Sequence, residues 1–142
     1  MLVELFRHGA PKSSIREFAL SRGFEFDEQI DPVEWNLYET SFFGRFDVAR
    51  NAVTGELDHT SFKYFEHDRA AGRGADAVVR SIVMFRVDPV SARFNPHSCA
   101  KGWTVEKSDG RLFMWRSKVK EPVQANEMKP FLDAALRAYR NL

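Results

Sequence analysis

A run of strand-like segments extends from Phe42 to Arg116 and constrains the fold more than any other feature of this sequence. Each segment is rich in aromatic or β-branched residues and is bounded by turn-forming residues. The connections are too short to hold crossover helices, so neighbouring strands should run antiparallel. The predicted strands are Phe43–Val48, Ala52–Asp58 with a bulge at Gly55, Thr60–His67, Val78–Val87, Gly102–Lys107 and Arg111–Arg116.

The clearest alternation lies in the segment Val78–Val87. Val79, Val83 and Phe85 share one face of an extended chain, whereas Arg80 and Arg86 point to the other. The last two segments form the clearest hairpin, because Ser108–Gly110 supplies residues that tolerate positive φ. Two registers remain open for this hairpin. Trp103 and Val105 share a face either with Phe113 and Trp115 or with Leu112 and Met114.

Helical signals stand at both ends of the chain. Ser14 and Glu17 match a capping box, and Gly23 is suited to end that first helix. A second helix is predicted at 126–141, with Pro130 in its first turn. Its apolar stripe consists of Met128, Phe131, Leu132, Ala135, Leu136 and Tyr139.

Together these elements predict one α+β domain over residues 1–142. We expect a curved antiparallel sheet of about five to seven strands, with the N-terminal helix and the C-terminal amphipathic helix packed on it. A pleckstrin-like barrel capped by a helix also fits this pattern, by analogy. The side chains expected in the core are Phe85, Trp103, Trp115, Phe131 and Leu132.

Composition indicates the cellular compartment and limits the kinds of partner that the chain could bind. Cys99 is the only cysteine, which excludes an internal disulfide and fits a reducing compartment. No apolar run is long enough to insert into a membrane, and Glu4 and Arg7 interrupt any secretory signal. The formal net charge of +1 argues against general nucleic-acid binding. These features predict a cytoplasmic protein and leave its oligomeric state open.

One alternative is catalysis near the N-terminus. The segment Leu5-Phe6-Arg7-His8-Gly9 resembles the opening motif of the histidine phosphatase family, in which the histidine is phosphorylated and the arginine holds the phosphate. The resemblance implies a second His-Gly pair late in the chain, which this sequence lacks. Arg7 and His8 are still an alternative catalytic pair, for a small hydrolase or phosphatase.

A second catalytic alternative for a small hydrolase or phosphatase is a thiolate–imidazole pair formed by Cys99 and His97. These two residues share a face if the chain is extended there. With His59 and His67 they could also form a metal site, but the paired spacing of a zinc module is absent. The strand end at Glu66–Asp68 is expected to be solvated. No metal is predicted, and no cofactor either, because no phosphate-binding glycine motif occurs.

The segment Glu25–Glu39 is the strongest candidate for a binding surface. Carboxylates accelerate the encounter with a basic partner, and exposed aromatic rings hold the contact. We therefore predict a non-catalytic protein-interaction module, for example an accessory or immunity-type protein. In the competing interpretation, Phe24, Phe26 and Trp35 only anchor the connection to the sheet. The predicted contact residues are Glu25, Asp27, Glu28, Asp31, Glu34, Trp35, Tyr38 and Glu39.

The order of elements resembles a group of uncharacterised bacterial α+β domains, some of which are tethered to membrane helices. The resemblance covers most of the chain from Ile15 onward and implies the same α+β fold, with no activity attached. It is carried by Arg22-Gly23-Phe24, the strand pair 51–65 around Gly55, the Gly-rich stretch 71–75, the segment 79–94, Gly102-Trp103-Thr104-Val105-Glu106, the strand 112–115 and the last apolar helix.

Overall fold

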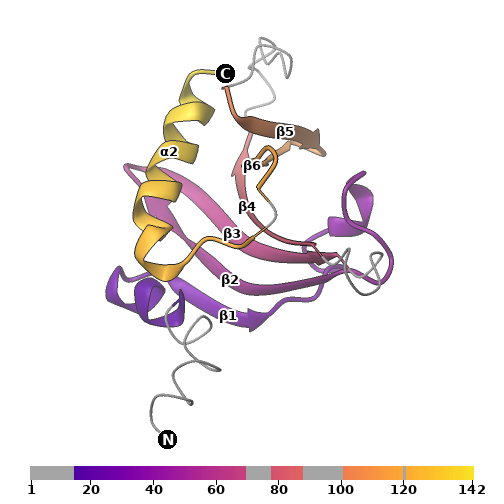
Figure 1. The fold of residues 1–142 in the computed structure, drawn as a ribbon, viewed down its shortest axis with the longest axis horizontal. Coiled ribbons are helices and arrows are strands. Elements are labelled where there is room, and N and C mark those ends of the chain that lie inside the picture. The colour runs from indigo at the N-terminus through magenta and orange to yellow at the C-terminus, as the bar shows by residue number, and fades with distance from the viewer. Residues whose placement is uncertain (1–14, 70–77, 88–100, 120) are drawn as a thin grey trace, which may run out of the picture.

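The computed structural model describes residues 15–69, 78–87, 101–119 and 121–142. These residues form a six-stranded antiparallel sheet with the strand order β1-β2-β3-β4-β6-β5 (Figure 1). The predicted α+β class and the antiparallel sheet are confirmed. The strands are β1 (Glu25–Gln29), β2 (Val48–Leu57), β3 (Thr60–Arg69), β4 (Val78–Arg86), β5 (Trp103–Ser108) and β6 (Arg111–Arg116).

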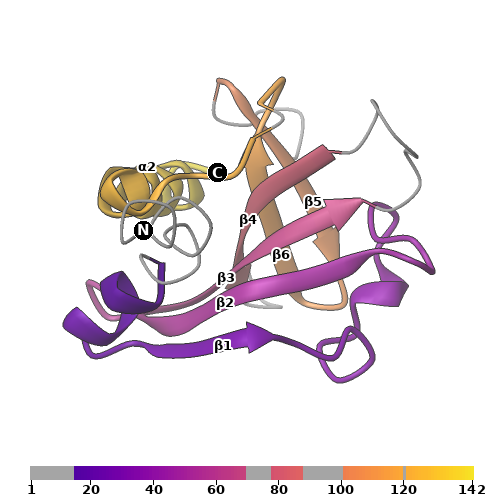
Figure 2. The same ribbon diagram turned by 60° about the horizontal axis from the view of Figure 1, so that its bottom comes forward.

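Two helical segments pack on the same face of this sheet. Residues 15–21 are helical, and helix α2 (Met128–Arg140) follows a short 3-10 turn at Ala125–Glu127. Figure 2 shows the sheet bending around α2, so that β1, β2 and β3 lie beneath the helix and the other strands rise beside it. None of the helices within the described ranges is long and apolar enough to span a bilayer.

The concave face of the sheet carries the larger core. Tyr64 and Met114 from the strands pack there with Leu132 from α2 and Ile15 from the first helical segment. The predicted apolar stripe of α2 is buried apart from Tyr139, which is partly exposed and stacks on Phe85 at a centroid distance of 4.4 Å. The five residues expected in the core are all buried.

The connection between β1 and β2, residues 30–47, covers part of the convex face. Leu37 and Phe43 from this connection join Phe65, Ile82 and Phe113 from the sheet in a second core. The described chain therefore has three layers, with helices on one face of the sheet and an irregular segment on the other.

The β5–β6 hairpin adopts the second of the two registers that the sequence left open. Val105 pairs with Met114, and Thr104 pairs with Trp115. Val105 therefore lies on the concave side with Met114 and Leu112. Asp109 at φ 50° and Gly110 at φ 72° form the turn, as the residue types predict.

Two predictions about strands are wrong. Residues 43–47 were expected to be extended, but Asp47 closes a turn there, because its carboxylate accepts a 2.7 Å hydrogen bond from the backbone N–H of Gly44. The strand β1 was missed because its acidic residues disfavour strands. As an edge strand, β1 leaves these carboxylates in solvent, and charge at an edge also discourages unwanted strand pairing.

The predicted bulge at Gly55 is also wrong. The register shifts instead between Arg50 and Val53, where Asn51 adopts φ 50°. Gly55 is required for a different reason: a Cβ at this position would lie 2.2 Å from the ring of Phe24. The glycine therefore permits the chain before β1 to pack closely on β2.

Candidate functional site

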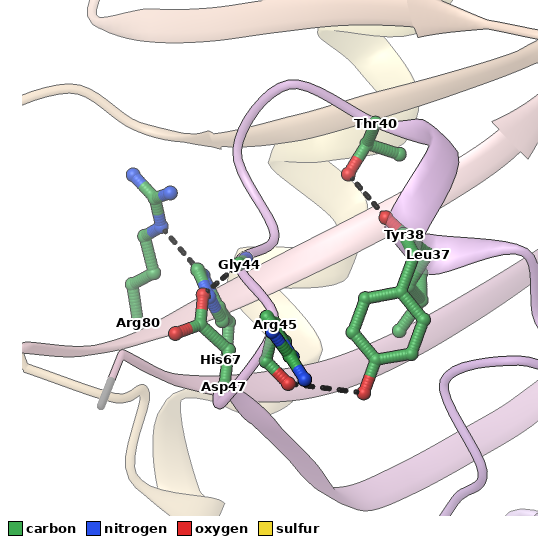
Figure 3. A network of polar contacts seen from close by, with 8 residues as sticks. All are labelled: Leu37, Tyr38, Thr40, Gly44, Arg45, Asp47, His67 and Arg80. Atoms are coloured by element: carbon green, nitrogen blue, oxygen red, sulfur yellow. Dashed lines mark hydrogen bonds and ion pairs between the residues drawn. The ribbon is translucent and has the colours of Figure 1, made fainter. Parts of the chain in front are cut away.

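A buried histidine of the sheet lies at the centre of the polar contacts drawn in Figure 3. His67 on β3 is fully buried, and its Nε2 lies 2.7 Å from Oδ2 of Asp47 at the end of the connection. The same carboxylate accepts the backbone N–H of Gly44. Two residues that are 20 positions apart in the chain thus join the connection to the central sheet.

The hydrogen bond to the second ring nitrogen of His67 shows which tautomer the ring adopts. Nδ1 of His67 accepts a 3.2 Å hydrogen bond from Nε of Arg80 on β4. Because a guanidinium can only donate, Nδ1 carries no proton and the ring is the neutral Nε2–H tautomer. Burial lowers the pKa of His67 below its usual range, and the nearby Arg80 charge adds to this, although Asp47 opposes both effects.

Aromatic rings enclose the pair. The ring of Phe43 lies 5.0 Å and that of Phe42 5.7 Å from the His67 ring. The guanidinium carbon of Arg80 lies 4.3 Å from the centroid of the Trp115 ring, in a cation–π arrangement. Water has no access to the imidazole, so the hydrogen bonds to it act in a low-dielectric setting.

This geometry favours anchoring over catalysis. A general base needs one nitrogen that can take a substrate proton, and both nitrogens of His67 are already bonded inside the core. The prediction that residues 66–68 are solvated is wrong for Glu66 and His67, which are both buried. We interpret the Asp47–His67 pair as the clasp that fixes residues 30–47 on the sheet.

A second buried network lies on the concave side of the same strands. The hydroxyl of Tyr64 and Oγ of Ser81 are 2.7 Å apart, and Ser81 also accepts the backbone N–H of Val123 at 2.8 Å. Beside them, the carboxylate of Glu66 accepts a 3.1 Å hydrogen bond from the side chain of Asn51 in the bulge. These contacts join β2, β3 and β4 to the chain that leads into α2.

Burial raises the pKa of the Glu66 carboxyl, although the Asn51 hydrogen bond and the charge of Arg50 oppose the effect. The folded state therefore holds this proton to higher pH than the unfolded chain, whose ordinary value is 4.5. As the pH rises above that value, the unfolded state ionises first and the folded protein loses stability. The ionised carboxylate is thus a cost to folding at neutral pH.

We predict that Glu66→Gln increases the free energy of unfolding at about pH 8 relative to wild type, since the amide still accepts from Asn51 but carries no charge. The gain should shrink towards the acid side, where the wild-type carboxyl is protonated in both states. Urea unfolding over a pH series measures this. The exposed Glu56→Gln is the control, and a gain at Glu66 that does not vary with pH would contradict the prediction.

Among the residues that it describes, the structure does not bring together the others predicted for catalysis or metal binding. Arg7, His8, His97 and Cys99 lie outside the described residues. His59 is exposed in the β2–β3 turn, at the opposite end of β3 from His67, so these two histidines do not meet. Within the described part of the chain no group of three or more His, Cys, Asp or Glu side chains gathers into a metal-binding arrangement.

The predicted acidic segment runs along the edge strand and into the connection. All six of its carboxylates are exposed: Glu25, Asp27, Glu28, Asp31, Glu34 and Glu39. They do not all share one face, because Asp27 pairs with Ala52 on the convex side and alternation places Glu28 on the concave side. Asp31 has a structural role, because its carboxylate accepts the backbone N–H of Val33 at 2.9 Å.

The two aromatic residues of this segment differ in exposure. Trp35 is half-buried, with its ring edge-on to Phe65 and the ammonium of Lys63 4.4 Å from its centroid. Tyr38 keeps 44% of its surface exposed and packs against Phe43. Trp35 therefore follows the anchoring interpretation, whereas Tyr38 is available at the surface.

Comparison with known proteins does not place the chain in a family. No family model, curated protein or solved structure matches it. Any function must therefore be argued from the arrangement of its own side chains.

Sequence reasoning missed the clasp, although two signals point to it. Alternation along β3 places His67 on the same face as Phe65, which is a core face. The spacing of Gly44 and Asp47 permits the carboxylate to close a tight turn. Their partnership could not be read from either signal alone, because it depends on how the connection crosses the sheet.

Proposed function

We propose that this chain is a non-catalytic protein-interaction module that binds a basic partner through residues 25–47. The observation that carries the proposal is that one segment holds both exposed apolar side chains and exposed carboxylates. Among the described residues, five large hydrophobic side chains are exposed, and three of them, Val33, Tyr38 and Phe46, lie on the connection 30–47. Exposed aromatic residues of this kind supply the contact area in many interfaces.

Rigidity supports the same function. The connection is held by the Asp47–His67 clasp, by two hydrogen bonds from Arg111 to the carbonyls of Trp35 and Asn36, and by Thr40, whose hydroxyl donates to the carbonyl of Leu37 at 2.6 Å. A surface whose backbone is fixed before binding loses less conformational entropy on binding. Such a surface is consistent with a binding role.

Charge supports a basic partner. The ion pairs between described residues do not include Asp27, Glu34 or Glu39, so these carboxylates remain available to an incoming cation. Their exposure suits long-range steering of the encounter more than tight binding. The apolar side chains then provide the desolvated part of the contact. An accessory or immunity-type protein that neutralises a basic protein would need this surface and no catalytic residue.

We predict that Asp27→Lys with Glu34→Lys abolishes binding of basic peptides that wild type selects from a displayed random library. The matched control is Glu121→Lys with Glu127→Lys, which changes the net charge equally at exposed positions before α2. Wild type should enrich sequences rich in Lys or Arg together with apolar residues. Binding should weaken as salt rises from about 0.05 M to about 0.3 M, because exposed charges are screened.

Two outcomes of this selection contradict the proposal. One is enrichment of peptides without basic residues. The other is equal binding of the enriched peptides to wild type and to the Asp27→Lys, Glu34→Lys variant. Loss of binding in the control as well would mean that net charge, and not this surface, governs the interaction.

A further inference from the structure

The convex face of the sheet is not covered at the end away from the clasp, and a groove lies there. It has a volume of about 670 Å³. Met84 and Lys63 line it together with Arg86. A second groove of about 600 Å³ also includes Arg86 and continues to Arg111. The shared arginine makes the two hollows neighbours on the surface, and each is of a size that suits a small-molecule ligand.

Three cations of the two grooves stand on adjacent strands, and Arg22 before β1 also lines the first groove. Arg86 on β4 pairs directly with Arg111 on β6, and Lys63 on β3 pairs with Met84, two residues from Arg86 on β4. Alternation places all three side chains on the convex face, because Met84 and Phe113 belong to the convex core. Like charges directly opposite each other in an antiparallel pair destabilise the sheet.

No carboxylate within the described ranges forms an ion pair with these cations. The ion pairs between described residues do not include Lys63, Arg86 or Arg111. Arg111 donates to the carbonyls of Trp35 and Asn36, which carry no formal charge, so its own charge is not neutralised. Asn36 is itself held at φ 53°, in the left-handed region, where its carbonyl meets Arg111. The groove thus fixes cations that repel one another.

Acidic residues flank this cationic centre. Glu25 on β1 and Glu56 on β2 line the first groove, and Asp109 in the β5–β6 turn lines the second. Following the strand order across the sheet, two carboxylates come first, then the three cations, then the last carboxylate. A long polyanion would have to cross the carboxylates on both sides, whereas a compact anion can lie over the cations between them. The pattern therefore favours a small ligand over a nucleic acid.

We propose that Lys63, Arg86 and Arg111 bind a small oxyanion that carries several negative charges, with phosphate or carboxylate groups. Guanidinium groups bind both kinds of oxyanion through paired N–H donors. The ligand would neutralise the Arg86–Arg111 repulsion, so binding should also stabilise the fold. The apolar side chain of Met84 at the groove suits an organic anion.

The test measures anion affinity by calorimetric titration and the unfolding temperature of the full chain. Both are measured with pyrophosphate and with citrate, each against sodium chloride at matched ionic strength. Wild type should bind at least one of the two and unfold at a higher temperature in its presence. Lys63→Gln with Arg86→Gln should weaken this binding about tenfold or more, as expected for the loss of charge-assisted hydrogen bonds. Preference between the two anions identifies the phosphate or the carboxylate class.

The matched control is Lys129→Gln with Arg137→Gln, which removes two exposed charges from α2 and should leave binding unchanged. Without an anion, the groove variant loses the repulsion between Arg86 and Arg111 but also the contact of Lys63 with the Trp35 ring, and these two effects oppose each other. It should therefore unfold close to wild type in sodium chloride alone, which shows that unfolding does not explain its loss of binding. Equal binding by wild type and the groove variant would overturn the proposal. So would an absence of stabilisation by either anion beyond that of sodium chloride.

Discussion

Replacing His67 by alanine should lower the free energy of unfolding by about 3 kcal/mol, as expected when a buried carboxylate loses one hydrogen-bond donor and a buried ring is removed. The side chain of Asp47 is almost fully buried, and His67 supplies the side-chain donor that lies 2.7 Å from its Oδ2. The substitution also opens a cavity among Phe42 and Phe43 and removes the acceptor of Arg80. These effects act in the same direction.

Chemical denaturation measures this loss, and His59→Ala is the matched control. His59 is exposed in the β2–β3 turn, so its replacement should change stability by no more than about 0.5 kcal/mol. A loss at His67 as small as that of the control would mean that the clasp does not hold the connection. In the His67 variant, the amides of residues 30–47 should lose more protection from hydrogen exchange than the amides of β5 and β6.

Replacing Phe131 by alanine should lower the free energy of unfolding by about 3–5 kcal/mol, the usual cost of removing a large buried aromatic side chain. Phe131 is buried where α2 meets the sheet, with its ring 6.1 Å from Tyr64 and 5.5 Å from Trp103. These neighbours belong to β3 and β5, so the cavity would open between three elements. Partial collapse of the helix onto the sheet is opposed by the rest of the α2 stripe.

Urea unfolding compares this variant with Lys129→Ala on the exposed side of the same helix. The control removes only a surface ion pair with Asp133 and should cost less than about 1 kcal/mol. If Phe131→Ala cost no more than the control, α2 would not be part of the cooperative core. If the free energy of unfolding falls with urea concentration at the same slope as in wild type, the variant has lost stability without a change in compactness.

The parts of the fold that the sequence predicts are those with regular periodicity. The alternation in β4 and the apolar stripe of α2 each identify a buried face, and the structure confirms both. The hairpin turn at Asp109 and Gly110 follows from residue types that tolerate positive φ. In each case local chemistry and tertiary packing agree, so a short stretch of sequence is enough.

The parts that the sequence did not predict depend on contacts between distant segments. Residues 30–47 have no period of their own, and their path across the sheet is set by Leu37, Phe43 and the clasp. Burial of Glu66 and His67 runs against their polarity and is possible because hydrogen-bond partners meet them. The acidic segment was found from composition, but the exposed Phe46 beside it was not.

The binding surface can be mapped directly by titrating the wild-type protein with the selected basic peptide and following the amide chemical shifts by NMR. The largest shifts should occur between residues 25 and 47, around Tyr38 and Phe46, and the amides of α2 should not change. The Asp27→Lys, Glu34→Lys variant should show no shifts at the same peptide concentration. Shifts centred on α2, or on the groove around Arg86, would contradict the assignment of residues 25–47 as the binding surface.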